Sequence, residues 1–154
     1  MNAMRAVKVF ADTNVAFYSR EDTSDPKAAT AQLWLRECAA RRLLCLNLQV
    51  LNELANVLFR KRRQLNNEQV FEAIDTLSVL GSEPVTIQTV QTARAVRTAT
   101  GYSWWDSLLL ASALELGCSH FLSEDLQDGQ QIGDLTIINP FLHAPETILG
   151  PLED

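Results

Sequence analysis

Four acidic side chains, Asp12, Glu53, Asp106 and Asp125, are the residues of this sequence whose types and spacing could support chemistry. Each falls at the predicted end of a strand or near the start of a helix. Oxygen ligands without a neighbouring cysteine or histidine select hard cations, Mg²⁺ or Mn²⁺. Such a cation in an open cleft suits phosphoryl chemistry, because it lowers the pKa of a bound water and stabilises the leaving oxygen. No glycine-rich phosphate loop is present, so a nucleotide cofactor is not indicated.

Each of these acids also has a purely structural explanation. Asp106 could pair with Ser103 in a capping box, and Glu53 could be an ordinary first-turn glutamate. Asp12 or Asp125 could belong to an Asx turn. Taken together these readings are weaker, because the predicted topology points all four acids at one edge of one sheet. Two carboxylates about 5 Å apart repel by roughly 3 kcal/mol at an effective dielectric near 20, so a divalent cation is the natural counter-charge.

The elements that must position these acids form one predicted α/β domain over residues 1–154, with a core at about 7–141. Apolar and β-branched runs predict short buried strands at 6–11, 43–46, 84–87, 120–123 and 135–138. Helical spacing of apolar residues predicts helices at about 27–41, 50–60, 70–81, 89–100 and 103–116. Strands that alternate with helices favour a parallel sheet covered on both faces. Ligands of such sheets bind beyond the carboxyl ends of the strands.

Composition and cysteine usage limit the class of protein. The chain has 154 residues and is 47% hydrophobic, and its longest apolar runs are far below the ~20 residues of a membrane span. Residues 1–5 lack the apolar segment of a secretory signal. The three cysteines are odd in number and form no Cys-x-x-Cys pair, which favours core packing in a reducing compartment. We therefore expect a cytoplasmic protein without membrane contact.

Bulk charge does not identify the partner. The net charge is −6, from 13 basic and 19 acidic residues, and removing four carboxylates from the count leaves −6 + 4 = −2. The densest basic run, residues 60–63, is typical of a solvated helix end, with a phosphate-contacting rim as the functional alternative. Arg94 and Arg97 are candidate phosphate contacts, because their helix leads into the turn before Asp106. We expect Trp104 and Trp105 to pack in the core rather than to stack on a base.

Five segments, in this order, resemble the motifs of PIN-domain proteins. They are Asp12-Thr13-Asn14-Val15, Gln49-Val50-Leu51-Asn52-Glu53-Leu54, Trp105-Asp106-Ser107-Leu108, Leu122-Ser123-Glu124-Asp125-Leu126 and Asn139-Pro140-Phe141. The strongest resemblance is to the VapC-like ribonuclease toxins of bacterial toxin–antitoxin pairs. It covers nearly the whole chain, from about Val7 to Phe141. A single motif is weak evidence for the family, but the order of the motifs and their spacing over the length of a domain are specific to it.

The resemblance implies a fold, an activity and partners. The fold would be a three-layer α/β/α arrangement around a mostly parallel five-stranded sheet of order 3-2-1-4-5. The activity would be Mg²⁺- or Mn²⁺-dependent cleavage of RNA phosphodiesters by a toxin of a type II pair. The protein would form homodimers and would be neutralised by a cognate antitoxin.

The resemblance also assigns roles to individual positions. The residues that match the three core acids of the family are Asp12, Glu53 and Asp106. The fourth acid falls on Asp125 by the Thr/Ser-x-Asp pattern, with Glu124 as a rival metal ligand and Asp128 as a weaker one. The small polar residues that would orient these acids are Thr13, Asn14 and Ser123. With RNA as the implied substrate, Arg94 and Arg97 are candidate RNA contacts.

Three other functions remain open at this point. A PIN-like scaffold would bind RNA or protein without cleavage. A HAD-type phosphatase or transferase expects Asp-x-Asp after the first strand, where this chain has Asn14 at the second position. A receiver-like domain phosphorylated on aspartate expects paired acids after the first strand and a lysine after the last, but Asp12 stands alone and Asn139 follows the last strand.

Overall fold

The computed structural model describes residues 6–22 and 24–151. Residues 1–5, where the sequence shows no apolar signal segment, lie outside these ranges. The strands are β1 (Val9–Ala11), β2 (Leu44–Cys45), β3 (His120–Leu122), β4 (Gln131–Ile132) and β5 (Leu135–Ile138). The helices are α1 (Thr13–Tyr18), α2 (Pro26–Ala40), α3 (Leu48–Lys61), α4 (Asn67–Ser78), α5 (Ile87–Thr100), α6 (Trp104–Glu115) and α7 (Pro145–Leu149).

The five strands form one mixed sheet in the order β2-β1-β3-β5-β4. The first four strands of this order are parallel, and β4 pairs antiparallel with β5. The expected α/β fold with a mostly parallel five-stranded sheet is therefore confirmed. The predicted strands at 43–46, 6–11, 120–123 and 135–138 are neighbours in that order, which is the 2-1-4-5 part of the expected arrangement.

The remaining strand is a different segment from the one predicted. Residues 84–87 do not form a strand; they lead into α5, whose N-cap is Thr86. Thr86 and Thr89 form a capping box at the start of α5, and this box uses the backbone N–H of Thr86 that a strand would need for pairing. The fifth strand is β4, which the sequence pattern missed because two residues show no alternation. It forms a hairpin with β5 through Gly133, whose φ of 57° requires the left-handed region.

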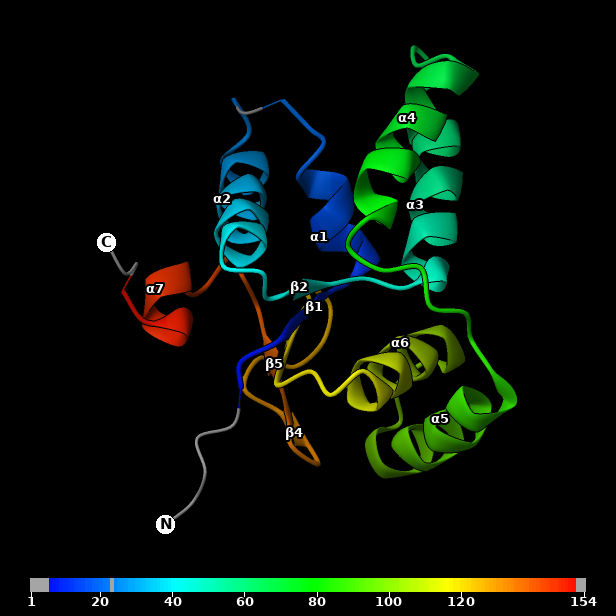
Figure 1. The fold of residues 1–154 in the computed structure, drawn as a ribbon, viewed down its shortest axis with the longest axis vertical. Coiled ribbons are helices and arrows are strands. Elements are labelled where there is room, and N and C mark those ends of the chain that lie inside the picture. Colours follow the sequence, from blue (N-terminus) through cyan, green and yellow to red (C-terminus); the bar gives the residue numbers. More distant parts are fainter. Residues whose placement is uncertain (1–5, 23, 152–154) are drawn as a thin grey trace.

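Helices cover the sheet on both faces (Figure 1). The helices α1 to α4 lie together on one side, and α5 and α6 pack against each other on the other. Every residue of α6 from Ser107 to Ala113 is buried, because this helix lies between the sheet and α5. The sheet interior includes a stacked pair, Phe10 and Phe121, with ring centroids 5.4 Å apart.

Helix α1 was not predicted, and it changes how the first acid is presented. It begins directly after β1, so that Asp12 is its N-cap and accepts a hydrogen bond from the Thr13 N–H. The three cysteines are buried and unpaired, as expected of core residues. Among the described residues, no helix is both long enough and apolar enough to span a membrane.

Candidate active site

Asp12 and Ser123 meet because their strands are neighbours in register. Ala11 of β1 is paired with Leu122 of β3, so the next residue of each strand leaves the sheet at the same level. The Ser123 hydroxyl donates a hydrogen bond of 2.7 Å to Asp12 Oδ2. Parallel strands thus bring together two residues that are 111 positions apart in the sequence.

Asp12 is a buried residue whose carboxyl group has a raised pKa. The residue is only 6% exposed. The pKa of Asp12 is raised from 3.8 to about 7, mainly by burial, and the nearby charges of Asp106 and Glu53 contribute to this rise. The hydrogen bonds from Ser123 and the Thr13 N–H lower it, but by less. Near neutral pH this carboxyl group is therefore divided between its neutral and charged forms.

Glu53 is held beside Asp12 by residues from two helices. The Thr13 hydroxyl of α1 donates to Glu53 Oε2 over 2.6 Å. The Gln49 amide, one turn earlier on α3, donates to Glu53 Oε1 over 3.1 Å. Glu53 is the sixth residue of α3 and not a first-turn glutamate, so that structural explanation of it was wrong. Sequence reasoning missed the role of Gln49, although its i, i+4 spacing from Glu53 places both on one face of the helix.

Asp106 enters the site from the first turn of α6. The Ser103 side chain caps this helix by accepting from the Asp106 N–H over 3.1 Å. The reciprocal bond of a capping box is not formed, and no described residue donates a hydrogen bond to the Asp106 carboxylate. The Gln49 amide also donates to the backbone oxygen of Trp105 over 3.2 Å, which ties the start of α6 to α3. The Asp106 carboxylate is therefore available for a ligand.

The two neighbouring acids after β3 have different partners. The Asn14 amide donates to Asp125 Oδ2 over 2.9 Å and lies 3.5 Å from Asp12 Oδ2, so it links these two carboxylates. Glu124 forms an ion pair with Lys27, which is half exposed and belongs to α2. The charge of Glu124 is thus balanced within the protein, whereas Asp125 is linked to Asp12.

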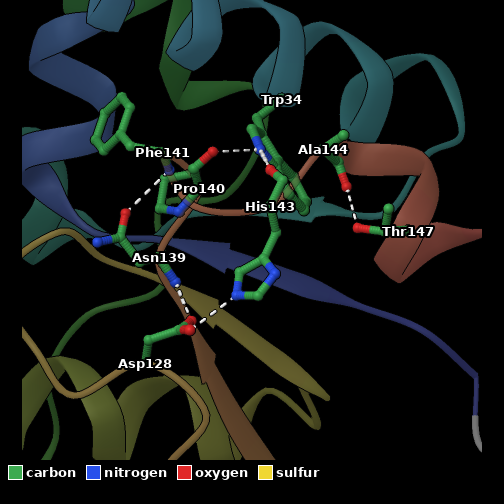
Figure 2. Close-up of polar contacts among 8 residues, drawn as sticks. All are labelled: Trp34, Asp128, Asn139, Pro140, Phe141, His143, Ala144 and Thr147. Atoms are coloured by element: carbon green, nitrogen blue, oxygen red, sulfur yellow. Dashed lines mark hydrogen bonds and ion pairs between the residues drawn. The ribbon is translucent and has the colours of Figure 1, made fainter.

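Asp128, the weaker rival for the fourth acid, belongs to a separate structural network (Figure 2). Its carboxylate accepts from the Asn139 N–H over 2.8 Å and pairs with His143 over 2.8 Å. In the same region the Trp34 indole donates to the backbone oxygens of Pro140 and His143, both at 2.9 Å. These contacts fasten the segment after β5 to α2, and Asp128 does not line the cavity described next.

The acids converge on one cavity of about 480 Å³ at the carboxyl edge of the sheet. Its acidic lining residues are Asp12, Glu53, Asp106, Glu124 and Asp125. Its other lining residues are Thr13, Asn14, Phe17, Tyr18, Asn56, Val57 and Lys61. Sequence reasoning gave Phe17, Tyr18, Asn56 and Val57 no role at the site, and it named Lys61 only within the run 60–63, with a phosphate-contacting rim as the functional alternative. Glu53, Val57 and Lys61 follow one another at helical spacing along α3, which is the signal that distinguishes this lysine from the rest of the run.

Arg94 and Arg97, the predicted RNA contacts, do not line this cavity. The Arg97 guanidinium donates to the backbone oxygen of Tyr102 over 2.6 Å at the end of α5. Arg94 is exposed on the same helix. Contact between either arginine and RNA remains a prediction.

The cavity has the ligand chemistry of a hard-cation site. Its donors are carboxylate oxygens, and Asn14 adds a side-chain oxygen that is buried and accepts no hydrogen bond from the described residues. Among those residues, no three acidic, histidine or cysteine side chains stand at the spacing of ligands to a single ion. Carboxylates gathered around one cavity without a counter-charge repel one another, which favours separation of their side chains. The donor set therefore fits Mg²⁺ or Mn²⁺, bound with some adjustment of side chains.

The fold and the cavity define an α/β domain with an acidic site at the carboxyl edge of its sheet. The sequence model of the PIN domain family matches residues 9–127, so the chain belongs to the PIN domain family. Proteins of this family are typically nucleases and generally use divalent metal ions. Family membership excludes the HAD-type and receiver-like alternatives.

Several solved structures share the fold. VapBC2 from Rickettsia felis, bound to a DNA fragment from its promoter, aligns with a TM-score of 0.62 and 14% identity over 85% of this chain and 97% of that one. VapC20 of Mycobacterium tuberculosis, a toxin that cleaves the sarcin-ricin loop, aligns with a TM-score of 0.55 and 19% identity over 74% and 87%. A toxin–antitoxin complex from Klebsiella pneumoniae aligns with a TM-score of 0.58 and 14% identity over 86% and 98%. No curated protein matches the chain by sequence.

Proposed function

We propose that this protein is a Mg²⁺- or Mn²⁺-dependent endoribonuclease that hydrolyses RNA phosphodiester bonds, and that it is the toxin of a type II toxin–antitoxin pair. The observation that carries the proposal is the convergence of Asp12, Glu53, Asp106 and Asp125, from four separate stretches of chain, on one cavity. The PIN fold and its likeness to VapC structures support the choice of RNA as the substrate.

Asp12, Glu53, Asp106 and Asp125 would hold the metal ion, with Glu124 as a further acid at the rim. The bound ion would supply a water of lowered pKa and would stabilise charge on the phosphate oxygens. The carboxylates are held in place by their neighbours, since Thr13 and Gln49 restrain Glu53 and Ser123 restrains Asp12. This restraint keeps the oxygen ligands in the cavity without a large entropy cost on binding.

The proton on Asp12 couples the site to pH. Because burial raises the pKa of Asp12 to about 7, a cation must displace a proton from this carboxyl group to bind at neutral pH. The Ser123 hydroxyl donates to Asp12 Oδ2 and so favours the charged form that a cation needs.

Lys61 is the basic residue best placed to contact the RNA backbone at this site. It lines the acidic cavity, is exposed, and forms no ion pair with a described residue. Its ammonium lies 5.5 Å from the centre of the Phe17 ring, which fixes its position on the cavity wall. Its neighbour Arg62 is instead paired with Glu21. An ammonium at the rim would orient a phosphate over the acids.

The proposed function also implies two protein partners, an antitoxin and a second copy of this chain. We infer a cognate antitoxin, because structures with this fold have been solved as toxin–antitoxin complexes. We also infer a homodimer. Co-expression with the product of a neighbouring reading frame, followed by size-exclusion chromatography, would test both: a stable complex supports the antitoxin, and the mass of the free protein gives its oligomeric state.

The test of the activity is cleavage of RNA by purified protein with Mn²⁺ and with EDTA. The wild type should cleave in Mn²⁺ only, and Asp106→Asn should abolish cleavage. The matched control is Asp75→Asn, which makes the same change of charge at an exposed position of α4 outside the cavity. Equal cleavage by Asp106→Asn and the wild type would indicate a contaminating nuclease and refute the proposal. Metal-independent RNA binding without cleavage would favour the scaffold alternative.

A further inference from the structure

A second hollow, the side groove, opens beside the acidic cavity. It has a volume of about 470 Å³ and lies between α3, the segment at 84–85 and the start of α6. Its apolar wall consists of Leu48, Val85, Trp105 and Leu108. Glu53 and Asn56 line both hollows, so the side groove adjoins the acidic cavity.

Trp105 is the most unusual residue of this groove. Trp104 packs against Ala93, Leu108 and Ala111, as expected of a core residue. Trp105, however, is 63% exposed, so its prediction as a core residue was wrong. An indole offers a large flat apolar face, and together with the exposed Leu48 and Val85 of the same groove it forms an apolar patch of the kind that marks an interaction site.

The position of Trp105 is coupled to the acidic site. The buried Gln49 amide donates both to the Trp105 backbone oxygen, over 3.2 Å, and to Glu53 Oε1, over 3.1 Å. Gln49 is 8% exposed, and its own side-chain oxygen is buried and accepts no hydrogen bond from a described residue. A group that stacks on Trp105 would therefore be held in a defined place relative to the carboxylates.

The polar lining of the groove matches a neutral, planar ligand with hydrogen-bonding edges. The exposed side chains of Asn52 and Asn56 carry both a donor and an acceptor. None of the described residues that line the groove is a lysine or arginine, so a phosphate has no counter-charge there. An unpaired base has the required shape and edges, because every base has a stacking face and a hydrogen-bonding edge.

We propose that the side groove binds one unpaired nucleobase of the RNA substrate, which stacks on Trp105 next to the cleaved bond. This assignment rests on the proposed ribonuclease function and makes its substrate single-stranded at the cleavage site. The groove shares Glu53 and Asn56 with the acidic cavity and so lies directly beside the proposed cleavage site, which favours a base over a second protein chain. The phosphate chain would pass over the acids, and the adjacent base would turn into the groove.

The first test measures binding without cleavage. In the Asp106→Asn background with Mn²⁺, Trp105→Ala should weaken binding of a short single-stranded RNA by about five- to a hundredfold, which is the effect of removing one stacking side chain. Trp105→Phe should restore most of the affinity, because phenylalanine also stacks. The control Leu142→Ala removes a side chain of similar exposure, 67%, that lies outside both hollows, and should leave binding unchanged.

The second test locates the base. An RNA that the wild type cleaves is made with one abasic position at a time, and KM is measured for the wild type and for Trp105→Ala. At one position next to the cut, the abasic change should raise KM in the wild type but not in Trp105→Ala, because the two changes remove the same contact.

The outcomes separate this proposal from the proposed function. The wild type could cleave RNA while no abasic position raises its KM without also raising the KM of Trp105→Ala. That result would refute the base groove, and the proposed ribonuclease function would stand. A change from dimer to monomer in Trp105→Ala, with RNA affinity unchanged, would refute it in favour of a subunit interface. If the wild type cleaves no RNA, the ribonuclease proposal fails, and equal RNA binding by Trp105→Ala and its parent then refutes the groove as well.

Discussion

The replacement Asp12→Asn tests the electrostatics of the cavity without changing the shape of the side chain. In the wild type, burial raises the pKa of Asp12 from 3.8 to about 7. In EDTA the folded protein therefore keeps a proton that the unfolded chain releases near pH 4. Between about pH 4 and pH 7 the folded state binds more protons than the unfolded state, so its stability falls as the pH rises.

The size of this loss follows from the two pKa values. A tenfold change in an equilibrium constant is worth about 1.4 kcal/mol, so the difference between 3.8 and about 7 corresponds to roughly 4 kcal/mol. In a protein of this length, a change of this size in the free energy of unfolding shifts the melting temperature by roughly 10 °C. The Asp12→Asn variant has no such proton to lose. It should match the wild type at pH 4 and exceed it by up to this amount at pH 8.

Thermal unfolding in EDTA from pH 4 to pH 8 measures the effect as the difference between the two proteins at each pH. Adding Mn²⁺ should reverse the order, because the cation stabilises only the protein that supplies the carboxylate, and the gain should grow with metal concentration. A difference between variant and wild type that stays constant across this pH range would refute the assignment of a raised pKa to Asp12. Absence of any Mn²⁺ effect on the wild type would refute the metal site.

Four further replacements test individual side chains. Ser123→Ala removes the 2.7 Å hydrogen bond to Asp12 and should raise the pKa of that carboxyl group further, so that Mn²⁺ stabilises the protein only at higher pH in a melting series. Asp125→Asn should lower Mn²⁺-dependent cleavage by at least about tenfold. Glu124→Gln should lower it less, because that carboxylate is already paired with a lysine; the reverse order in initial rates would exchange the two roles. Trp34→Phe leaves two backbone oxygens without their donor and should cost about 1–3 kcal/mol in urea unfolding, with cleavage unaffected.

The parallel core of the sheet and the four acids were predictable from the sequence, because both depend on local patterns. Short apolar runs that alternate with helical patterns indicate buried parallel strands, and the residue after each such strand lies at the carboxyl edge. This reasoning placed Asp12 and Asp125 at one edge, where the structure brings them to a shared cavity. It failed for β4, whose two residues carry no period, and for 84–87, where Thr86 caps a helix instead of pairing in a strand.

Tertiary structure alone decided which groups share the site and which face solvent. Glu124 and Asp125 are adjacent in sequence and chemically alike, but Lys27 reaches one and Asn14 the other from separate helices. Trp104 and Trp105 differ in the same way, since one faces α5 and the other lies open beside α3. The physical reason is that hydrophobic periodicity and chain order act along the chain. Charge pairing, burial and exposure instead depend on distances between segments that only packing brings together.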